Sequence, residues 1–279
     1  MTNETTMPNE SAGAPEAPIP ARCASGSLPA VSASNVRKSF GGREVLHDVS
    51  FSIDPGEVVS LIGPSGAGKS TMLRCLTLLD TFDGGRLAYG DLEVCADDAH
   101  GRAAYSKAGM REARMRFGLA FQNYNLFPHY SVIKNVTDAP IVVQKRPKDE
   151  VYEQGMGLLR YLGLEEHAEK VPCQLSGGQQ QRVAIARALC MNPQVMYFDE
   201  ATSALDPKLT AQMRDLIRDL AAKGMAVGIV THEMGFAREV SDRVCFLFDG
   251  SIVEEGSPDE VLTHPSDSRT RAFLSDAAD

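Results

Sequence analysis

The feature that most constrains this 279-residue chain is a glycine-rich octet, residues 63–70, with an apolar run before it. The run at 58–62 predicts a buried strand, and apolar residues at helical spacing after the octet predict a helix. The octet fits G-x-x-x-x-G-K-[ST], in which glycines let backbone N–H groups turn towards an anion. The positive end of the helix favours the same anion. The stretch therefore predicts a phosphate-binding loop.

The side chains of this loop indicate which phosphate compound it binds. Lys69 would reach the β and γ phosphates as a point charge, and the Ser70 hydroxyl would sit on Mg²⁺. The sequence therefore predicts a nucleotide site. The residues expected to line it are Gly63, Pro64, Ser65, Gly66, Ala67, Gly68, Lys69, Ser70 and Thr71.

Composition limits the compartment and the partners. The net charge of -9 argues against a nucleic-acid partner, since phosphate backbones are bound by a surplus of Lys and Arg. The six cysteines lie far apart with no C-x-x-C pair, which predicts reduced thiols in a cytosolic protein. No apolar run approaches the roughly 18 residues that span a bilayer, and the N-terminus lacks an apolar signal core. We expect a chain that is neither exported nor membrane-spanning by itself.

The pattern of apolar and polar residues along the chain predicts one domain with an N-terminal tail. Residues 1–34 are rich in Pro, Ala, Ser, Glu and Asn without hydrophobic periodicity, so we expect them to be disordered. Residues 35–276 alternate strand and helix patterns and contain enough apolar material for one α/β domain. Helical patterns dominate about 123–180, which predicts an inserted helical subdomain.

Three predicted buried strands end on polar residues. They run into Gln122, into the pair Asp199 and Glu200, and into His232. The carboxyl ends of parallel strands are where such sheets place their chemistry. Asp199 can hold a magnesium ion through water, and Glu200 can polarise an attacking water.

A second glycine-containing helix start predicts a second anion site, separate from the first. Ser176 has the position of an N-cap, and the two glycines that follow expose backbone N–H groups. The residues of this motif are Leu175, Ser176, Gly177, Gly178 and Gln179.

The order of phosphate loop, strand-end glutamine, LSGGQ, Asp-Glu strand, SALD and strand-end histidine resembles that of the ATP-binding cassette (ABC) ATPases. The resemblance covers about residues 34–276. It implies an α/β fold: a P-loop NTPase core with a parallel sheet, an antiparallel β subdomain and an inserted helical subdomain. It also implies hydrolysis of ATP with Mg²⁺.

The resemblance assigns roles to single residues. Phe40, for which core packing is the simpler interpretation from position alone, matches the aromatic residue that stacks on adenine. Gln122 matches the glutamine that touches Mg²⁺ and senses the membrane partner. Glu200 matches the general base and His232 the γ-phosphate contact, with Lys69 on the same phosphates. The metal ligands implied are Ser70, Gln122 and Asp199.

The same resemblance implies a homodimer in the ATP-bound state. Ser176, Gly177 and Gly178 would contact the γ-phosphate held by the opposite subunit, so two chains would enclose two ATP molecules head to tail. The turn that matches the family's D-loop consists of Ser203, Ala204, Leu205 and Asp206.

Longer stretches of sequence indicate which group of ABC ATPases the chain resembles. Three stretches resemble those of bacterial importers for polar amino acids. They are FQNYNLFPHYSVIKNVTDAPIVV, THEMGFAREVSDRVCFLFDGSIVEEG and the closing RTRAFL. This implies docking on an integral membrane permease, an indirect extracytoplasmic amino-acid-binding protein, and a peripheral location on the cytoplasmic side of the inner membrane. One departure is Ala201, where relatives often carry proline.

Other functions of the same fold stay open from the sequence. One is the ATPase of an exporter, a lipoprotein-release complex or a cell-division complex. A soluble cassette acting on ribosomes or DNA is disfavoured by the single cassette and the acidic charge. A regulatory cassette that does not hydrolyse ATP is disfavoured because Lys69, Asp199, Glu200 and His232 are all present.

Overall fold

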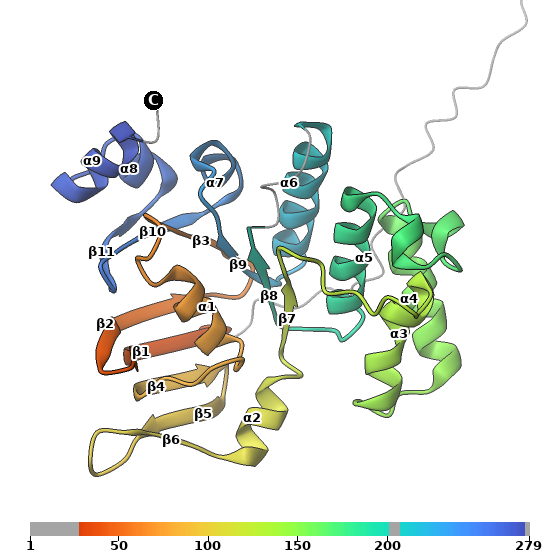
Figure 1. Ribbon diagram of the computed structural model, residues 1–279, viewed down its shortest axis with the longest axis horizontal. Coiled ribbons are helices and arrows are strands. Elements are labelled where there is room, and N and C mark those ends of the chain that lie inside the picture. The colour runs from red at the N-terminus through yellow and green to blue at the C-terminus, as the bar shows by residue number, and fades with distance from the viewer. Residues whose placement is uncertain (1–27, 201–206, 277–279) are drawn as a thin grey trace, which may run out of the picture.

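The computed structural model describes residues 28–200 and 207–276, which build two sheets and a separate group of helices (Figure 1). One sheet has five strands in the order β2-β1-β4-β5-β6, and neighbouring strands run antiparallel. Its strands are β1 (Val31–Phe40), β2 (Arg43–Ile53), β4 (Gly84–Tyr89), β5 (Leu92–Asp97) and β6 (Ala103–Tyr105).

The second sheet has six strands in the order β11-β10-β3-β9-β8-β7. All neighbours are parallel except the edge strand β11, which pairs antiparallel with β10. Its strands are β3 (Val58–Ile62), β7 (Phe117–Ala120), β8 (Val195–Asp199), β9 (Ala226–Val230), β10 (Arg243–Phe248) and β11 (Ser251–Gly256).

Helices cover the sheets and form the third part. In Figure 1, α3, α4 and α5 gather on the side away from the antiparallel sheet. The predicted fold class is therefore confirmed, including the inserted helical subdomain. The helices are α1 (Lys69–Leu76), α2 (Lys107–Ala113), α3 (Val132–Val142), α4 (Lys148–Tyr161), α5 (Gly177–Leu189), α6 (Pro207–Ala222), α7 (Met234–Val240), α8 (Pro258–Leu262) and α9 (Ser268–Asp276), with short 3-10 turns at Glu165–His167 and Pro172–Gln174.

Strand β8, which lies between β9 and the edge strand β7, shows how the core is divided. Met196 and Phe198 pack into a cluster with the helical subdomain, whereas Val195 and Tyr197 pack into a cluster with the antiparallel sheet. Successive side chains of a strand point to opposite faces, so a strand buried on both faces reads as a continuous apolar run. This burial fixes the position of the strand end that carries Asp199.

The structure corrects two predicted boundaries. β1 begins at Val31, so residues 31–34 belong to the sheet rather than to the tail. Val31 and Ala33 are buried and pair with β2, and Ala33 also pairs with β4, which outweighs the weak strand propensity of Ser and Ala. The helical subdomain continues past 180 to the end of α5 at Leu189. The rest of the predicted tail, residues 1–27, lies outside the described residues.

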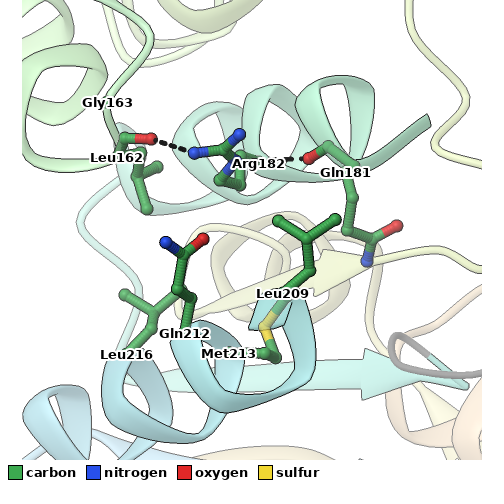
Figure 2. Close-up of a pocket in the computed structure, with 9 residues that line it drawn as sticks. Leu162, Gly163, Gln181, Arg182, Leu209, Gln212, Met213 and Leu216 are labelled. Carbon is green, nitrogen blue, oxygen red and sulfur yellow. Dashed lines mark hydrogen bonds between the residues drawn. The ribbon is translucent and has the colours of Figure 1, made fainter. Parts of the chain in front are cut away.

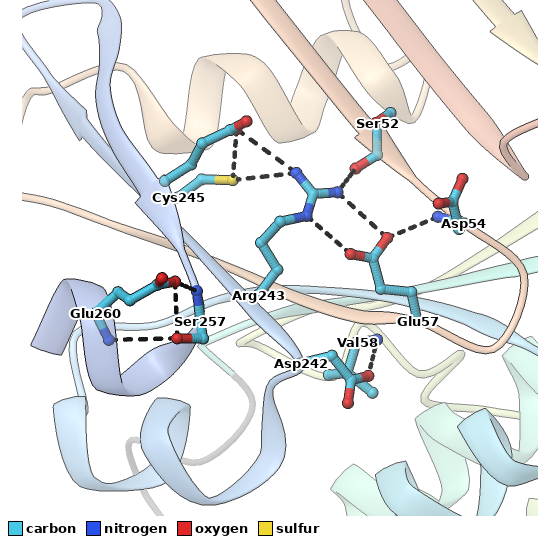
Figure 3. Close-up of polar contacts among 10 residues, drawn as sticks. Ser52, Asp54, Glu57, Val58, Asp242, Arg243, Cys245, Ser257 and Glu260 are labelled. Carbon is cyan, nitrogen blue, oxygen red and sulfur yellow. Dashed lines mark hydrogen bonds and ion pairs between the residues drawn. The ribbon is translucent and has the colours of Figure 1, made fainter.

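A polar cluster joins the two sheets just before the phosphate loop (Figure 3). Arg243 of β10 donates through Nε to Glu57 Oε1 at 2.8 Å and through Nη2 to the Ser52 carbonyl at 2.8 Å. The Asp242 carboxylate accepts from the Val58 N–H at 2.8 Å. The hydrogen bond to Glu57 raises the pKa of Arg243 despite partial burial, so the ion pair persists. The cluster sets where β3 begins.

Candidate functional site

The phosphate loop connects β3 to α1, and its glycines are required by close backbone contacts. Gly63 has φ +149°, and a Cβ there would lie 2.1 Å from the Leu247 carbonyl oxygen. Gly68 has φ +108°, and a Cβ there would lie 2.9 Å from Leu46 Cδ2. Side chains at these positions would force the loop away from β10 and β2. The predicted strand, loop and helix are all present.

Lys69 lies across this loop. Its ammonium donates to the carbonyls of Gly63 at 2.8 Å and Pro64 at 2.9 Å. Burial lowers the pKa of Lys69, and the charge of Glu200 partly opposes this. The loop lysine and the predicted general base therefore belong to one electrostatic site. Ser70 and Thr71 follow in the first turn of α1.

The ends of β7, β8 and β9 bring three predicted residues together. Gln122 Nε2 donates to Glu200 Oε2 at 3.0 Å, and His232 Nδ1 lies 3.5 Å from Glu200 Oε1. Because the three strands are adjacent and parallel, their carboxyl ends meet at one edge of the sheet. The prediction from the strand ends thus holds for the position of these side chains.

Glu200 is held in a strained backbone conformation. Its φ is +47°, a region that residues other than glycine rarely adopt. Its N–H donates to the Val230 carbonyl at 2.9 Å, which ties the residue to the end of β9. Burial and the adjacent Glu200 charge raise the pKa of Asp199. Two neighbouring carboxylates at one strand end favour binding of a cation.

Phe40 is at the end of β1, and its exposure argues against the core-packing interpretation. The residue is 48% exposed, so it is not part of the core. The Lys38 ammonium lies 4.9 Å from the centroid of its ring and also pairs with Asp80 at 2.8 Å. Lys38 therefore links Phe40 to the segment after α1, a contact that sequence analysis missed because a lysine in a strand carries no distinct signal.

The second predicted anion site is the beginning of α5. Ser176 Oγ accepts from the Gln179 N–H at 3.3 Å, and Gln179 Oε1 accepts from the Ser176 N–H at 2.9 Å. This capping box confirms the predicted N-cap. The Gln179 amide also contacts His167 Nε2 at 2.7 Å. Leu175 is buried below the two glycines.

The two predicted anion sites, at the starts of α1 and α5, lie in different parts of the molecule. In Figure 1, α5 belongs to the helical group, whereas α1 lies beside the antiparallel sheet. The predicted D-loop, Ser203 to Asp206, lies outside the described residues.

A groove of about 440 Å³ is lined by Phe121, the residue before Gln122, and by residues of the helical subdomain. It runs between the end of α1, β7, α3 and α5, and we call it the lateral groove. Two of the large apolar residues that line the groove are exposed to solvent. The exposed fraction is 51% for Leu79 and 52% for Phe127. Leu79 lies beyond α1, which ends at Leu76. Other lining residues are Leu78, Phe121, Arg187 and Met191.

Arg187 connects α5 to the segment after Gln122. Its guanidinium donates to the carbonyls of Asn125 at 2.6 Å and Tyr124 at 3.0 Å. Burial lowers the pKa of Arg187. The helix that begins with the LSGGQ motif is thereby connected to the segment that follows Gln122. The sequence signal for this contact was a charged residue within the otherwise apolar stretch 183–189.

Comparison with known proteins agrees with this geometry. The ABC transporter family matches residues 46–203. The nopaline permease ATP-binding protein P of Agrobacterium fabrum is 47% identical over 249 residues, which cover 88% of this chain and 97% of that protein. The arginine transport ATP-binding protein ArgV of Corynebacterium glutamicum is 47% identical over 247 residues, 88% and 97% of the two chains. The L-cystine transport system ATP-binding protein TcyN of Escherichia coli is 44% identical, with 88% and 98% covered.

Solved structures share the fold. CbiO1 of Clostridium perfringens, part of the transporter complex CbiONQ, superposes with a TM-score of 0.75 at 27% identity, covering 84% of this chain and 91% of that one. The dimeric cassette MJ0796, described as a bacterial ABC transporter cassette, has a TM-score of 0.70 at 33% identity, with 82% and 98% covered. The motifs, the geometry at the strand ends and these similarities lead to one conclusion: the chain belongs to the ABC transporter family, of which it is an ATP-binding ATPase subunit.

Proposed function

We propose that this chain hydrolyses ATP to drive import of a polar amino acid through a membrane permease. The observation that carries the cargo class is its 43–47% identity to ATP-binding proteins named for nopaline, octopine, arginine, cystine or other amino-acid transport. The nucleotide-site motifs support the hydrolysis of ATP, and the lateral groove supports docking on a permease.

The proposed reaction is in-line attack of water on the γ-phosphorus of ATP. Glu200 accepts the proton of the attacking water, and its two oxygens are oriented by the contacts to Gln122 and His232. Lys69 and His232 offset the negative charge of the transferring phosphoryl group. The glycine-rich loop offers its N–H groups to the phosphates.

The oxygen donors near Asp199 fit a magnesium ion. Ser70 supplies a hydroxyl and Asp199 a carboxylate whose pKa is raised by burial and by a neighbouring negative charge. The Gln122 amide oxygen has no donor among the described residues, while its Nε2 is engaged by Glu200. Hard oxygen ligands of this kind suit Mg²⁺. When bound, Mg²⁺ would neutralise charge between the β and γ phosphates.

We propose further that two copies complete each other's sites. Ser176, Gly177 and Gly178 stand at the start of α5 in the helical group, whereas Lys69 starts α1 beside the antiparallel sheet, so we propose that a second copy places its α5 start on the γ-phosphate. The dimeric form in which the MJ0796 cassette was solved supports this arrangement. The dimer would close on ATP and open after hydrolysis.

Adenine would stack on Phe40. Replacing Phe40 by alanine should weaken ATP binding by about 10- to 100-fold, since base stacking on an aromatic side chain contributes roughly 1–3 kcal/mol. Fluorescent-ATP titration measures the effect. Phe40→Trp should keep the affinity because the ring is retained. Equal affinities of Phe40→Ala and the unsubstituted protein would rule out stacking here.

The lateral groove is the proposed docking site for a cytoplasmic helix of the permease. Its exposed Leu79 and Phe127 provide an apolar surface next to Gln122. Introducing Leu79→Asp with Phe127→Asp should abolish co-purification with the permease while ATP binding is kept. Tyr152→Asp changes another exposed side chain, on α4 and outside the groove, and serves as the matched control. Retention of the permease by the groove variant would contradict docking at this site.

The location follows from these partners. Among residues 28–200 and 207–276, no helix has both the length and the apolarity to cross a bilayer. We propose attachment through the permease at the cytoplasmic side of the inner membrane, with a binding protein acting from the other side of that permease.

The deciding experiment is gentle detergent extraction of native membranes and capture of the chain through a C-terminal tag. We expect recovery of a small permease whose ATPase activity rises with a binding protein plus arginine, glutamine or histidine. Recovery of a large exporter, a lipoprotein-release complex or a division protein would leave the ATPase chemistry standing and reject the import of amino acids.

A further inference from the structure

A pocket that the ATPase chemistry does not use lies between α5 and α6, close to the C-terminal end of α4 (Figure 2). Its volume is about 180 Å³. Arg182 of α5 lies on one wall, and Gln212 of α6 lies on the opposite wall (Figure 2). The remaining walls are mostly apolar and include Leu162, Leu209, Met213 and Leu216.

Arg182 is a half-buried cation that has no ion-pair partner in the described part of the chain. It donates through Nη1 to the Leu162 carbonyl at 2.9 Å and through Nε to the Gly178 carbonyl at 3.3 Å. Within residues 28–200 and 207–276 no carboxylate forms an ion pair with it, and burial is what lowers its pKa. Its Nη2 donates to none of the described acceptors. A buried charge with free donors is costly unless an anion compensates it.

A second polar group in the pocket wall is unsatisfied. Gln181 is 2% exposed, and its Nε2 has no hydrogen-bond partner among the described residues. In Figure 2 its amide lies beside Leu209, on the same side of the pocket as α5. Since most buried polar atoms are paired, this one indicates a place where an acceptor is expected.

Among the residues that the structure describes, the carboxylates of the adjoining depression, Asp215 and Asp219, are already engaged. Asp219, in the adjoining depression, accepts from the Tyr161 hydroxyl at 2.7 Å. Asp215 pairs with Arg214 at 3.3 Å. The electrostatic character of the pocket itself is therefore set by Arg182, which favours an anion.

The apolar walls define the rest of the ligand. Leu162, Met213 and Leu216 are each at most 8% exposed and offer methyl and thioether surface. A cavity of about 150 Å³ with similar walls in another protein takes up benzene, so this pocket has room for about six to eight carbon atoms. A planar carboxylate matches the guanidinium geometry, whereas a phosphate dianion would leave one charge uncompensated.

We propose that this pocket binds an amphipathic monocarboxylate of medium length. The carboxylate would lie on Arg182 with the Gln212 amide as second donor, and the apolar chain would lie against Leu209, Met213 and Leu216. Such a ligand would bridge the helix that begins with LSGGQ and the helix α6 of the core. The contact between these helices is already tight, because a Cβ at Gly178 would lie 2.5 Å from Leu209 Cδ1.

Isothermal titration of the full-length purified protein with octanoate and with 1-octanol tests the proposal. We expect saturable octanoate binding at one site per chain and affinity for 1-octanol at least about tenfold lower, because the alcohol lacks the charged partner of Arg182. Equal affinities of the two, or no saturable binding of octanoate at millimolar concentration, would overturn it.

Two variants locate the site. Arg182→Gln should weaken octanoate binding at least about tenfold through loss of the charged donor. Gln212→Trp, at an exposed position, should fill the pocket and abolish binding without disturbing the fold, which thermal unfolding checks. Arg218→Trp introduces the same side chain on α6 outside the pocket and should bind octanoate normally. Normal octanoate binding by Gln212→Trp would exclude this pocket.

Discussion

Replacing Glu200 by glutamine should reduce ATP turnover by about 10²- to 10⁴-fold, the range over which general acid–base catalysis contributes. Glutamine has nearly the same shape and can keep the contacts to Gln122 and His232, but it cannot accept a proton from water. ATP binding should therefore stay intact, and the ATP-bound dimer should accumulate. Phosphate release measures turnover, and size-exclusion chromatography in saturating ATP measures the dimer.

The control for this variant is Glu233→Gln. Glu233 follows His232 and stands at the start of α7, and Glu233→Gln makes the same change of charge at a residue that we do not assign to the reaction. We expect it to turn over ATP at close to the normal rate. Normal turnover of Glu200→Gln would show that another group accepts the proton. A monomeric Glu200→Gln protein in saturating ATP would count against the head-to-tail dimer.

Gly63→Ala should destabilise the protein by roughly 3 kcal/mol or more, at the upper end of overpacking costs. The new methyl group would lie 2.1 Å from the Leu247 carbonyl oxygen, which belongs to β10 and cannot move without breaking the sheet. Urea denaturation measures the loss, and ATP titration should show that the loop no longer binds phosphate.

Gly66→Ala is the matched control in the same loop. Gly66 also has a positive φ, +81°, but a Cβ there meets no heavy atom within 4 Å. Only the backbone strain remains, which costs about 1–2 kcal/mol. Equal destabilisation by the two substitutions would mean that backbone strain, and not the contact with β10, requires glycine at position 63.

The local patterns predicted most elements of the site. The strand 58–62, the loop and the following helix were predicted because a continuous apolar run, glycine spacing and helical periodicity are properties of neighbouring residues. The convergence of Gln122, Glu200 and His232 followed from one rule, that parallel strands end at the same edge. The N-cap at Ser176 likewise depends on residues three positions apart.

Other features depend on contacts between distant segments. Phe40 is indistinguishable from a core residue in the sequence, and its 48% exposure is decided by how β1 ends beside the segment after α1. The lateral groove arises because α1 stops at Leu76 and leaves Leu79 facing α3 and α5. The start of β1 at Val31 required β2 and β4 as partners.

The sequence by itself therefore determined the glycine-rich loop, the sheet edge at which Gln122, Glu200 and His232 meet, and the family to which the chain belongs. These rest on short-range backbone conformation and on strand direction, which a few neighbouring residues specify. The tertiary structure alone decided which apolar side chains stay exposed, as at Leu79, and which cations lack a carboxylate partner within residues 28–200 and 207–276, as at Arg182. Burial and charge compensation are sums over residues that lie far apart in the chain, so no local pattern contains them.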